Sequence, residues 1–340
     1  MQKVVTFGEL LLKLSPHNYQ RILQTDSFNV EYSGAEANVA VSLANFGIPV
    51  SFVSKVPNQE IGTSAINAIR SYGVITDNII QGEGRLGIYF SEKGASQRSS
   101  KVIYDRHYSA FSESTSSDYD WDLIFEDAEW FHFSGITPAL SDSVANICLE
   151  ACKKAKEKGL TVSCDLNYRS KLWSREKASA VMKALAPYID VCISNESDIS
   201  DVFGIKAANT DEEYESVDDI AYSVVAKELS EKYGFKAVAI TLRHSISASD
   251  NIWSAVLCDG KTSYYGKKYS IHIVDRIGGG DSFSAGLIYG FINKKEPQYI
   301  LDFAVAASCL KHSIEGDFNM VTVEEVEALL KGHGSGRIQR

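Results

Sequence analysis

The chain has 340 residues, of which 44% are hydrophobic and 23% charged, and its 34 Lys and Arg against 44 Asp and Glu give a formal net charge of −10. This balance is typical of a globular protein with a large core, and it excludes a wholly disordered, collagenous or coiled-coil chain. The acidic excess argues against a protein that follows nucleic-acid phosphates, and it means that an anionic substrate would need a local basic pocket.

In chain order, short β-branched and aromatic runs alternate with helical patterns. The sequence predicts strand Val4–Phe7, helix Ala35–Phe46, strand Ser51–Val56, helix Gly62–Tyr72, strand Trp130–Phe133, helix Asp142–Lys158, strand Thr161–Leu166, helix Arg175–Leu185, strand Val191–Ser194, helix Asp218–Lys232, strand Ala237–Leu242 and helices Ser282–Asn293, Gln298–Ser313 and Val323–Leu330. The strands lack a clean in/out alternation, so we expect both of their faces to be covered. The pattern predicts an α/β fold with a doubly wound, mostly parallel sheet flanked by helices.

Two segments, 13–33 and 85–112, interrupt this rhythm. Leu86–Ser91 and Lys101–His107 alternate apolar and polar side chains around a turn at Gly94. This alternation predicts antiparallel strands with one solvent-exposed face. We therefore expect a small β-sheet lid inserted into a single domain that spans residues 1–332, followed by a flexible tail at 333–340.

The sequence contains no clear pattern for a membrane-spanning segment, a signal peptide or a disulfide framework. No apolar stretch approaches the roughly 18 residues of a membrane-spanning helix, and the N-terminus lacks the pattern of a signal peptide. The six cysteines are scattered and form no Cys-x-x-Cys pair, so we expect free thiols in a reducing compartment. The sequence predicts a cytoplasmic protein without a nucleic-acid or membrane partner.

The most informative run is Asp275-Arg276-Ile277-Gly278-Gly279-Gly280-Asp281, which directly precedes a predicted helix. Consecutive glycines let the backbone turn several amides toward one point, and a helix N-terminus adds unpaired donors and a positive end. Such a cradle suits the charge that develops on a phosphoryl group in transfer, and Asp281 could accept a proton from an attacking hydroxyl. The alternative is a glycine-rich turn in which Asp281 caps the helix.

A second run, Ser33-Gly34-Ala35-Glu36-Ala37-Asn38, also enters a helix from a turn of small residues. Gly34 would allow a ligand to approach closely, and Asn38 is polar in the first helical turn. A well-packed helix start would explain the same residues.

Together these runs resemble the paired signatures of the PfkB (ribokinase-like) carbohydrate kinases, a Gly-x-x-x-Asn stretch and a later Asp-x-x-Gly-Ala-Gly-Asp. Here they are Gly34 to Asn38 and Asp275 to Asp281, with Gly279 where the family usually has Ala. The resemblance extends from residue 3 to about residue 330. It implies a ribokinase-like fold and ATP-dependent phosphorylation of a sugar hydroxyl.

The resemblance also implies roles for single positions. Asp281 would be the catalytic base, and Gly278, Gly279 and Gly280 the anion hole. The family's Asn-x-x-Glu motif is similar to Asn195-Glu196-Ser197-Asp198, whose fourth residue would act on Mg²⁺ through water. The implied ATP-binding residues are Asn195, Thr241, Arg243, Gly278 and Gly280, and the implied metal residues are Asn195 and Asp198. Asp275 resembles a residue near a monovalent-cation site, so such a cation is a further possible cofactor.

The substrate is indicated by the run Asp165-Leu166-Asn167-Tyr168-Arg169 and by lid residues Tyr89, Tyr104 and Arg106. The run resembles fructokinases and 2-keto-3-deoxygluconate kinases alike, and the lid resembles the latter. Guanidinium groups can bind the carboxylate of a sugar acid with two hydrogen bonds. The resemblance thus implies phosphorylation of 2-keto-3-deoxygluconate to its 6-phosphate, with substrate-binding residues Gly34, Asn38, Tyr89, Tyr104, Arg106 and Arg169.

Three alternatives stay open. Arg106 and Arg169 could be surface residues or phosphate contacts. The enzyme could be a fructokinase or another sugar kinase of this family, or the chain could be a nucleotide- or sugar-binding regulator without turnover. The resemblance further implies a homodimer that pairs through the lid.

Overall fold

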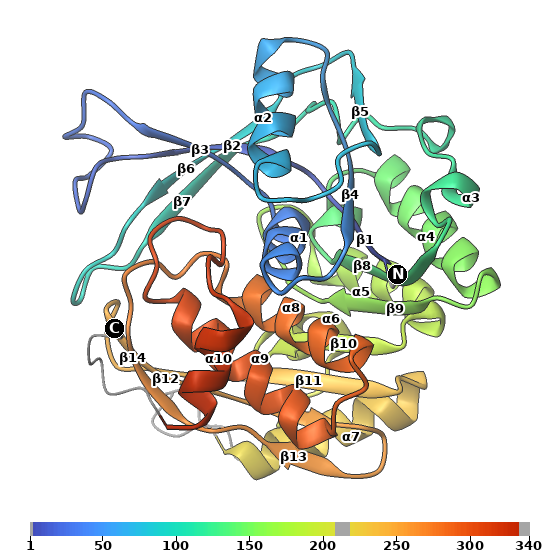
Figure 1. The fold of residues 1–340 in the computed structure, drawn as a ribbon, viewed down its shortest axis with the longest axis vertical. Coiled ribbons are helices and arrows are strands. Elements are labelled where there is room, and N and C mark those ends of the chain that lie inside the picture. Colours follow the sequence, from blue (N-terminus) through green and yellow to red (C-terminus); the bar gives the residue numbers. More distant parts are fainter. Residues whose placement is uncertain (1–2, 208–217, 333–340) are drawn as a thin grey trace.

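The computed structural model describes residues 3–207 and 218–332, so the expected tail at 333–340 lies outside the described residues. These residues form a ten-stranded sheet in the order β13-β12-β11-β10-β9-β8-β1-β4-β5, with β14 also paired to β12. Figure 1 shows helices on both faces of this sheet and a smaller sheet that projects from it. The expected doubly wound α/β fold is confirmed.

The sheet is parallel from β11 to β5 and antiparallel at its other edge. Its strands are β1 (Lys3–Phe7), β4 (Val50–Pro57), β5 (Ile79–Gly82), β8 (Ala128–Ser134), β9 (Thr161–Asp165), β10 (Val191–Asn195), β11 (Ala237–Ser245), β12 (Asp250–Cys258), β13 (Ser263–Tyr265) and β14 (Tyr269–His272). The strands predicted from the sequence are all present, with ends that shift by a few residues.

The helices divide between two hydrophobic cores, one on each face of the sheet. One core includes side chains of α3 (Trp121–Ile124), α4 (Asp142–Glu157), α5 (Arg175–Leu185), α6 (Asp198–Phe203) and α7 (Asp219–Tyr233). The other includes α1 (Ala35–Asn45), α2 (Glu60–Arg70), α8 (Gly279–Ile292), α9 (Pro297–Lys311) and α10 (Val323–Leu330). Consecutive strand residues such as Phe52 and Val53 belong to opposite cores, which explains why the strands show no polar alternation.

The projecting sheet is the lid, in the order β3-β2-β6-β7. It consists of β2 (Leu11–Ser15), β3 (Asn29–Ser33), β6 (Gly87–Glu92) and β7 (Lys101–Asp105). The predicted antiparallel pairing of the last two strands is confirmed, whereas β2 and β6 run parallel. One face of the lid is exposed, as expected, but its polarity is reversed.

The register explains this reversal. One cross-strand row holds Glu31, Lys13, Tyr89 and Tyr104, and the last two line a cleft. The adjacent row, on the opposite face, holds Val30, Leu14, Phe90 and Ile103, and Val30 remains 60% exposed. A sheet that covers a polar site turns its polar side chains inward, and this leaves the apolar row on the outside.

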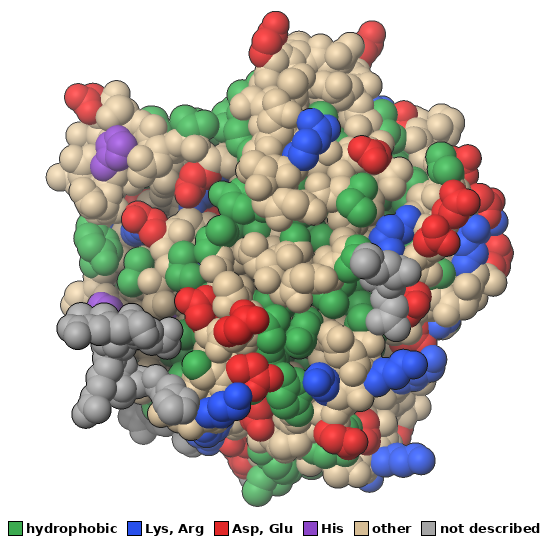
Figure 2. Space-filling model, viewed as in Figure 1, with side chains coloured by type: hydrophobic (Ala, Val, Ile, Leu, Met, Phe, Trp, Pro, Cys, Tyr) green, Lys and Arg blue, Asp and Glu red, His purple; other side chains and the backbone are tan. Residues whose placement is uncertain are grey.

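The surface carries charges of both signs. Figure 2 shows acidic and basic side chains interspersed over α3 and α4, where Lys154 and Lys158 pair with Asp122. None of the helices in residues 3–207 and 218–332 combines the length and hydropathy required to span a membrane. All six cysteines are free, as expected, and five of them are buried.

Candidate active site

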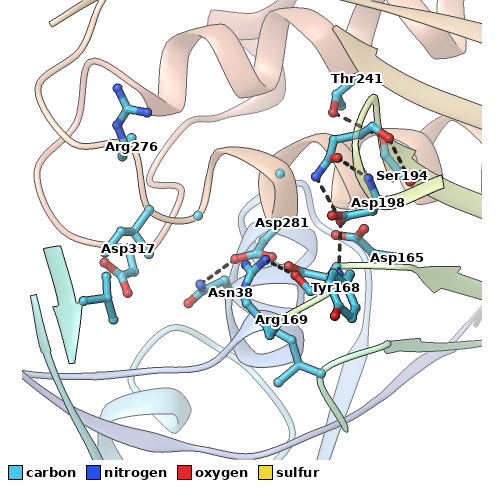
Figure 3. A pocket seen from close by; sticks show the side chains of 18 of the residues that line it. Asn38, Asp165, Tyr168, Arg169, Ser194, Asp198, Thr241, Arg276, Asp281 and Asp317 are labelled. Carbon is cyan, nitrogen blue, oxygen red and sulfur yellow. Dashed lines mark hydrogen bonds between the residues drawn. The ribbon is translucent and has the colours of Figure 1, made fainter. Parts of the chain in front are cut away.

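A cleft of about 1140 Å³ lies between the lid and the carboxyl ends of β9, β10 and β11. In a doubly wound fold, ligands bind at this edge of the sheet. Figure 3 shows side chains from α1, the β9 end and the start of α8 pointing into it. The cleft brings together all but one of the residues assigned above to catalysis or to substrate, ATP or Mg²⁺ binding: Gly34, Asn38, Tyr89, Tyr104, Arg106, Arg169, Asn195, Asp198, Thr241, Arg243, Gly278, Gly280 and Asp281. Asp275, expected near a monovalent cation, does not line it.

The glycine turn presents unpaired amides at the start of α8. Gly278 is left-handed, with φ of 82°, and a Cβ there would lie 2.0 Å from the carbonyl oxygen of Asp317. A Cβ on Gly280 would meet no atom of the described residues within 4 Å beyond its own turn of helix, because this residue faces the open cleft. Within the described residues, the amides of Gly280 and Asp281 have no hydrogen-bond partner. The turn can therefore hold an anion.

Gly279 is the predicted site residue that does not line the cleft. A side chain packs against it instead: a Cβ on Gly279 would lie 2.5 Å from Cε1 of the His312 ring. Its carbonyl accepts a 2.7 Å hydrogen bond from Oγ of Ser308, and the carbonyl of Ser308 lies 2.7 Å from Nδ1 of His312. The histidine therefore occupies the volume that the methyl group of the family's usual Ala would need.

We expect Gly279→Ala to lower the free energy of unfolding by about 1–3 kcal/mol, as overpacking does, and to reduce kcat by moving the turn. Because the obstacle is one side chain, His312→Ala combined with Gly279→Ala should recover much of both losses. A double-mutant cycle on thermal unfolding and turnover measures this coupling. Strictly additive effects would show that His312 does not explain the glycine.

Asp281 lies in the first turn of α8, and Gly278 rather than Asp281 is the N-cap residue. Its Oδ2 accepts a 2.7 Å hydrogen bond from Nδ2 of Asn38 (Figure 3). Burial raises the pKa of the Asp281 carboxyl to about 7, while the hydrogen bond from Asn38 opposes the rise. A carboxyl group with a pKa near neutrality is suited to accept a proton from a hydroxyl.

Helix α1 positions Asn38, and its start is held by one backbone contact and by one buried side chain. A Cβ on Gly34 would lie 2.1 Å from the carbonyl oxygen of Glu9, so the chain itself requires this glycine. Two residues on, the carboxylate of Glu36 accepts hydrogen bonds from the Ser134 amide and hydroxyl and from Oγ1 of Thr137. Sequence analysis did not identify Glu36 as important, since its partners lie about 100 residues away.

Three acids, Asp165, Asp198 and Asp281, converge beside Arg169, and the last two are buried. Asp198 accepts hydrogen bonds from Nδ2 of Asn195 at 2.9 Å and from the Tyr168 amide at 3.1 Å. Burial raises the pKa of Asp198 to about 6, and Arg169 opposes the rise. Burial, together with Asp198 and Asp281, also raises the pKa of Asp165 well above its usual range. A cation would relieve this crowding of carboxylates.

The other end of the cleft is basic. Thr241 lies beside Asn195 in the β10–β11 register, and its Oγ1 donates to the carbonyl of Ser194 at 3.3 Å. Arg243 and Arg276 also line the cleft, and the latter donates from Nη2 to the Ala248 carbonyl at 3.0 Å. Two guanidinium groups near the glycine turn provide the local positive charge that an acidic protein needs to attract a polyanion.

The comparisons with known proteins agree with this geometry. The model of the pfkB family carbohydrate kinases matches residues 1–321. The chain belongs to this family. It is therefore a carbohydrate kinase, and the resemblance read from its two glycine-containing runs is confirmed.

Similar proteins include two named kinases. The 2-dehydro-3-deoxygalactonokinase of Haloferax volcanii is 32% identical over 334 residues, which are 98% of each chain. The solved structure of the 2-dehydro-3-deoxygluconokinase of Thermotoga maritima is 51% identical, covers 98% of this chain and 100% of its own, and has a TM-score of 0.94. A putative ribokinase II from E. coli, solved with ATP and Mg²⁺, shares the fold at 20% identity and a TM-score of 0.79.

In this kinase the two arginines expected at the sugar differ in their surroundings. Arg106 is buried and donates to Oε2 of Glu9 from Nε at 2.7 Å and also from Nη2, while its Nη1 has no partner in the described part of the chain. Arg169 has no carboxylate within ion-pairing distance there, and its Nη1 donates to the Tyr168 carbonyl at 3.1 Å. Both guanidinium groups line the cleft and keep donors available.

Sequence analysis missed the polar network beneath the lid. Asp317 accepts hydrogen bonds from Nζ of Lys13 at 2.6 Å, from Oγ of Ser33 at 2.5 Å and from the Tyr89 hydroxyl. Burial opposes the charge on Lys13, but Asp317, Asp275 and Glu31 outweigh it and raise the lysine pKa. Nothing in the run around Asp317 marks it, because its partners come from the N-terminal third of the chain. The network attaches the lid to the loop behind the glycine turn.

Proposed function

We propose that this kinase transfers the γ-phosphoryl group of ATP to the terminal hydroxyl of 2-keto-3-deoxygluconate, giving the 6-phosphate. The observation that carries the proposal is the approach of two arginines, Arg106 and Arg169, to one cleft with Asp281 and the glycine turn. A neutral sugar requires no guanidinium groups, whereas a sugar acid has a carboxylate for them to bind. The name of the 51% identical Thermotoga maritima structure supports the same substrate.

The residues of the cleft suit an in-line transfer. Asp281 takes the proton of the attacking hydroxyl, an O–P bond forms to the γ-phosphorus, and the bond to the bridging oxygen breaks and leaves ADP. The amides of Gly280 and Asp281 stabilise the charge on the transferred group, and Asn38 holds the carboxylate of the base in place. Thr241, Arg243 and Asn195 line the nucleotide end. Gly34, Tyr89 and Tyr104 line the sugar end beneath the lid.

Mg²⁺ would neutralise phosphate charge in this reaction. In residues 3–207 and 218–332 no group of three or more His, Cys, Asp or Glu side chains is placed to hold a metal directly. The raised pKa of Asp198 and its contact with Asn195 fit a second-sphere site, in which both residues bind water of the hydrated ion. The proposed metal residues are therefore Asn195 and Asp198, acting through water.

The test is the release of ADP with a panel of substrates, measured chromatographically. We expect turnover with 2-keto-3-deoxygluconate and a much lower kcat/KM with fructose and ribose. The C4 epimer, 2-keto-3-deoxygalactonate, belongs in the panel because the Haloferax volcanii relative is named for it. A preference for fructose would replace the proposal with a fructokinase, and no ADP with any sugar would indicate a regulator without turnover.

We expect Arg106→Ala to lower kcat/KM for the keto acid by at least ~10-fold, the loss of one good hydrogen bond to a charged group, with little effect on fructose. The change also leaves Glu9 buried without its partner. Arg106→Lys therefore serves as a second variant, which keeps the positive charge but loses the two parallel N–H donors of the guanidinium group. Arg85→Ala is the matched control, because Arg85 also pairs with a carboxylate, that of Asp105 in the lid, but does not line the cleft. Equal losses on both substrates would contradict a carboxylate contact.

The protein would act in the cytoplasm as a homodimer joined through the lids. The apolar row Val30, Leu14, Phe90 and Ile103 on the outer face of the lid supports this arrangement, because a second lid would cover it. Analytical ultracentrifugation should give twice the 37.4 kDa mass of the chain. Val30→Glu should yield monomers, and a wild-type monomer at micromolar concentration would refute the dimer.

A further inference from the structure

Lys311 is the last residue of α9, and its side chain is fully buried. Its Nζ lies 2.7 Å from the carbonyl oxygen of Gly316, 3.2 Å from that of Asp275 and 3.5 Å from that of Ile314. Within the described residues no carboxylate oxygen lies within 4.0 Å of this nitrogen, so three backbone oxygens hold it instead. The proposed catalytic steps do not use this lysine.

The hydrogen-bond count favours the ammonium form. An ammonium group has three protons for three carbonyl oxygens, whereas a neutral amine would turn its lone pair toward one of them. The nitrogen also lies at the C-terminal end of a helix, where the backbone dipoles favour a cation. Burial lowers the pKa of Lys311, and Asp275 and Asp317 oppose this shift. The cage of carbonyls therefore contains a positive charge.

This charge lies directly behind the glycine turn. The cage joins the residue that begins the glycine run, Asp275, to the loop that follows α9. Two groups pack against Gly278. A Cβ on this glycine would lie 3.4 Å from Cε of Lys311 and would also meet the carbonyl oxygen of Asp317. Lys311 and Asp281 also interact electrostatically. A cation here both fixes the turn and favours negative charge on a bound phosphate.

Backbone carbonyl oxygens are also the ligands that proteins offer to potassium ions. The family resemblance implies a monovalent cation near Asp275, and the residues present do not fit one, because Nζ of Lys311 already fills the carbonyl cage. We propose that the ammonium of Lys311 is a built-in replacement for this cation, a positioning residue that makes the kinase independent of potassium. The proposal rests on the proposed anion hole.

The wild-type enzyme provides the first measurement. ADP release is followed chromatographically, without coupling enzymes, in tetramethylammonium, sodium, potassium or ammonium chloride at equal ionic strength. We expect the rates to agree within about twofold, since no small cation enters the cage. Activation of wild-type enzyme by potassium by an order of magnitude or more would overturn the proposal.

Two variants separate a charge in the cage from simple packing. Lys311→Ala opens the cage, and we expect its kcat to fall ~10-fold or more in tetramethylammonium, less than the loss of a direct anion-hole donor, and to recover in potassium or ammonium. Its thermal unfolding temperature should rise with the same two ions, a readout that requires no turnover. Lys311→Met keeps most of the volume of the lysine side chain but not its charge, so no added cation should restore its kcat or its stability.

A folded Lys311→Ala protein that no cation stabilises would show that the lysine only packs, and would overturn the proposal. Stabilisation by potassium without turnover on any sugar would instead support the built-in cation and refute the proposed substrate. If the alanine variant does not fold in any of the salts, the cation response of the wild-type enzyme decides the question.

Discussion

Asp281→Asn should lower kcat by at least ~10²-fold with every substrate that the enzyme accepts, because the hydroxyl then loses its general base. ATP binding, measured by calorimetry, should change little, since the amides of the glycine turn remain. Asp142→Asn is the matched control, because Asp142 also lies in the first turn of a helix but is exposed and remote from the cleft. Turnover of the Asp281 variant near the wild-type rate would refute its assignment as the base.

The same variant should be more stable than the wild-type protein above neutral pH. Burial raises the pKa of Asp281 to about 7, so the folded state binds this proton more tightly than the unfolded state does. The stability that this group contributes is complete below pH ~4 and is lost as the pH rises to about 7, on the order of 4 kcal/mol in total. Unfolding by urea at pH 5 and pH 8 measures this. We expect the advantage of Asp281→Asn to be larger at pH 8, and an advantage that does not depend on pH would contradict the raised pKa.

Activity should follow the opposite direction. The base must be ionised to accept a proton, so kcat/KM should rise with pH through about 7 and then level off. One group therefore makes the protein less stable at the pH where it makes the enzyme active.

Gly278→Ala should have the second largest effect. The new methyl group would lie 2.0 Å from the Asp317 carbonyl oxygen, and the left-handed φ of 82° costs an L-residue a further ~1 kcal/mol or more. Relief of the clash moves the turn, so we expect a loss of 10²- to 10³-fold in kcat, about the magnitude of one lost anion-hole donor. Turnover and the unfolding temperature are both measured.

Gly234→Ala controls for backbone strain alone. Gly234 ends α7 with φ of +77°, and apart from its chain neighbours no atom in the described part of the chain would lie within 4 Å of a Cβ there. It should lose about 1 kcal/mol of stability and no activity. If the two variants lose the same activity, the clash with Asp317 has no bearing on catalysis.

The two glycine-containing runs were sufficient to predict the family, because in each of them the residues that act together are also close in the sequence. The fold could be predicted for a similar reason: runs such as Ser51–Val56 and Val191–Ser194 lack a clean alternation of polar and apolar residues, which is typical of a sheet covered on both sides. Some residues proposed for the site also stood out by position, since Arg106 follows a strand and Asp281 lies in the first turn of a helix. Others, such as Tyr89 and Thr241, lie within strands.

What the sequence determined by itself was therefore local: which segments form strands, which turn can hold an anion, and which acid follows that turn. Tertiary structure alone decided that Glu9 pairs with Arg106, that His312 replaces the methyl group of an alanine, and that Lys311 fills a cage made partly by Asp275. These contacts join residues far apart in the chain, and their energies come from burial and from the direction of each donor. Neither quantity exists until the sheet and its two cores bring the partners together.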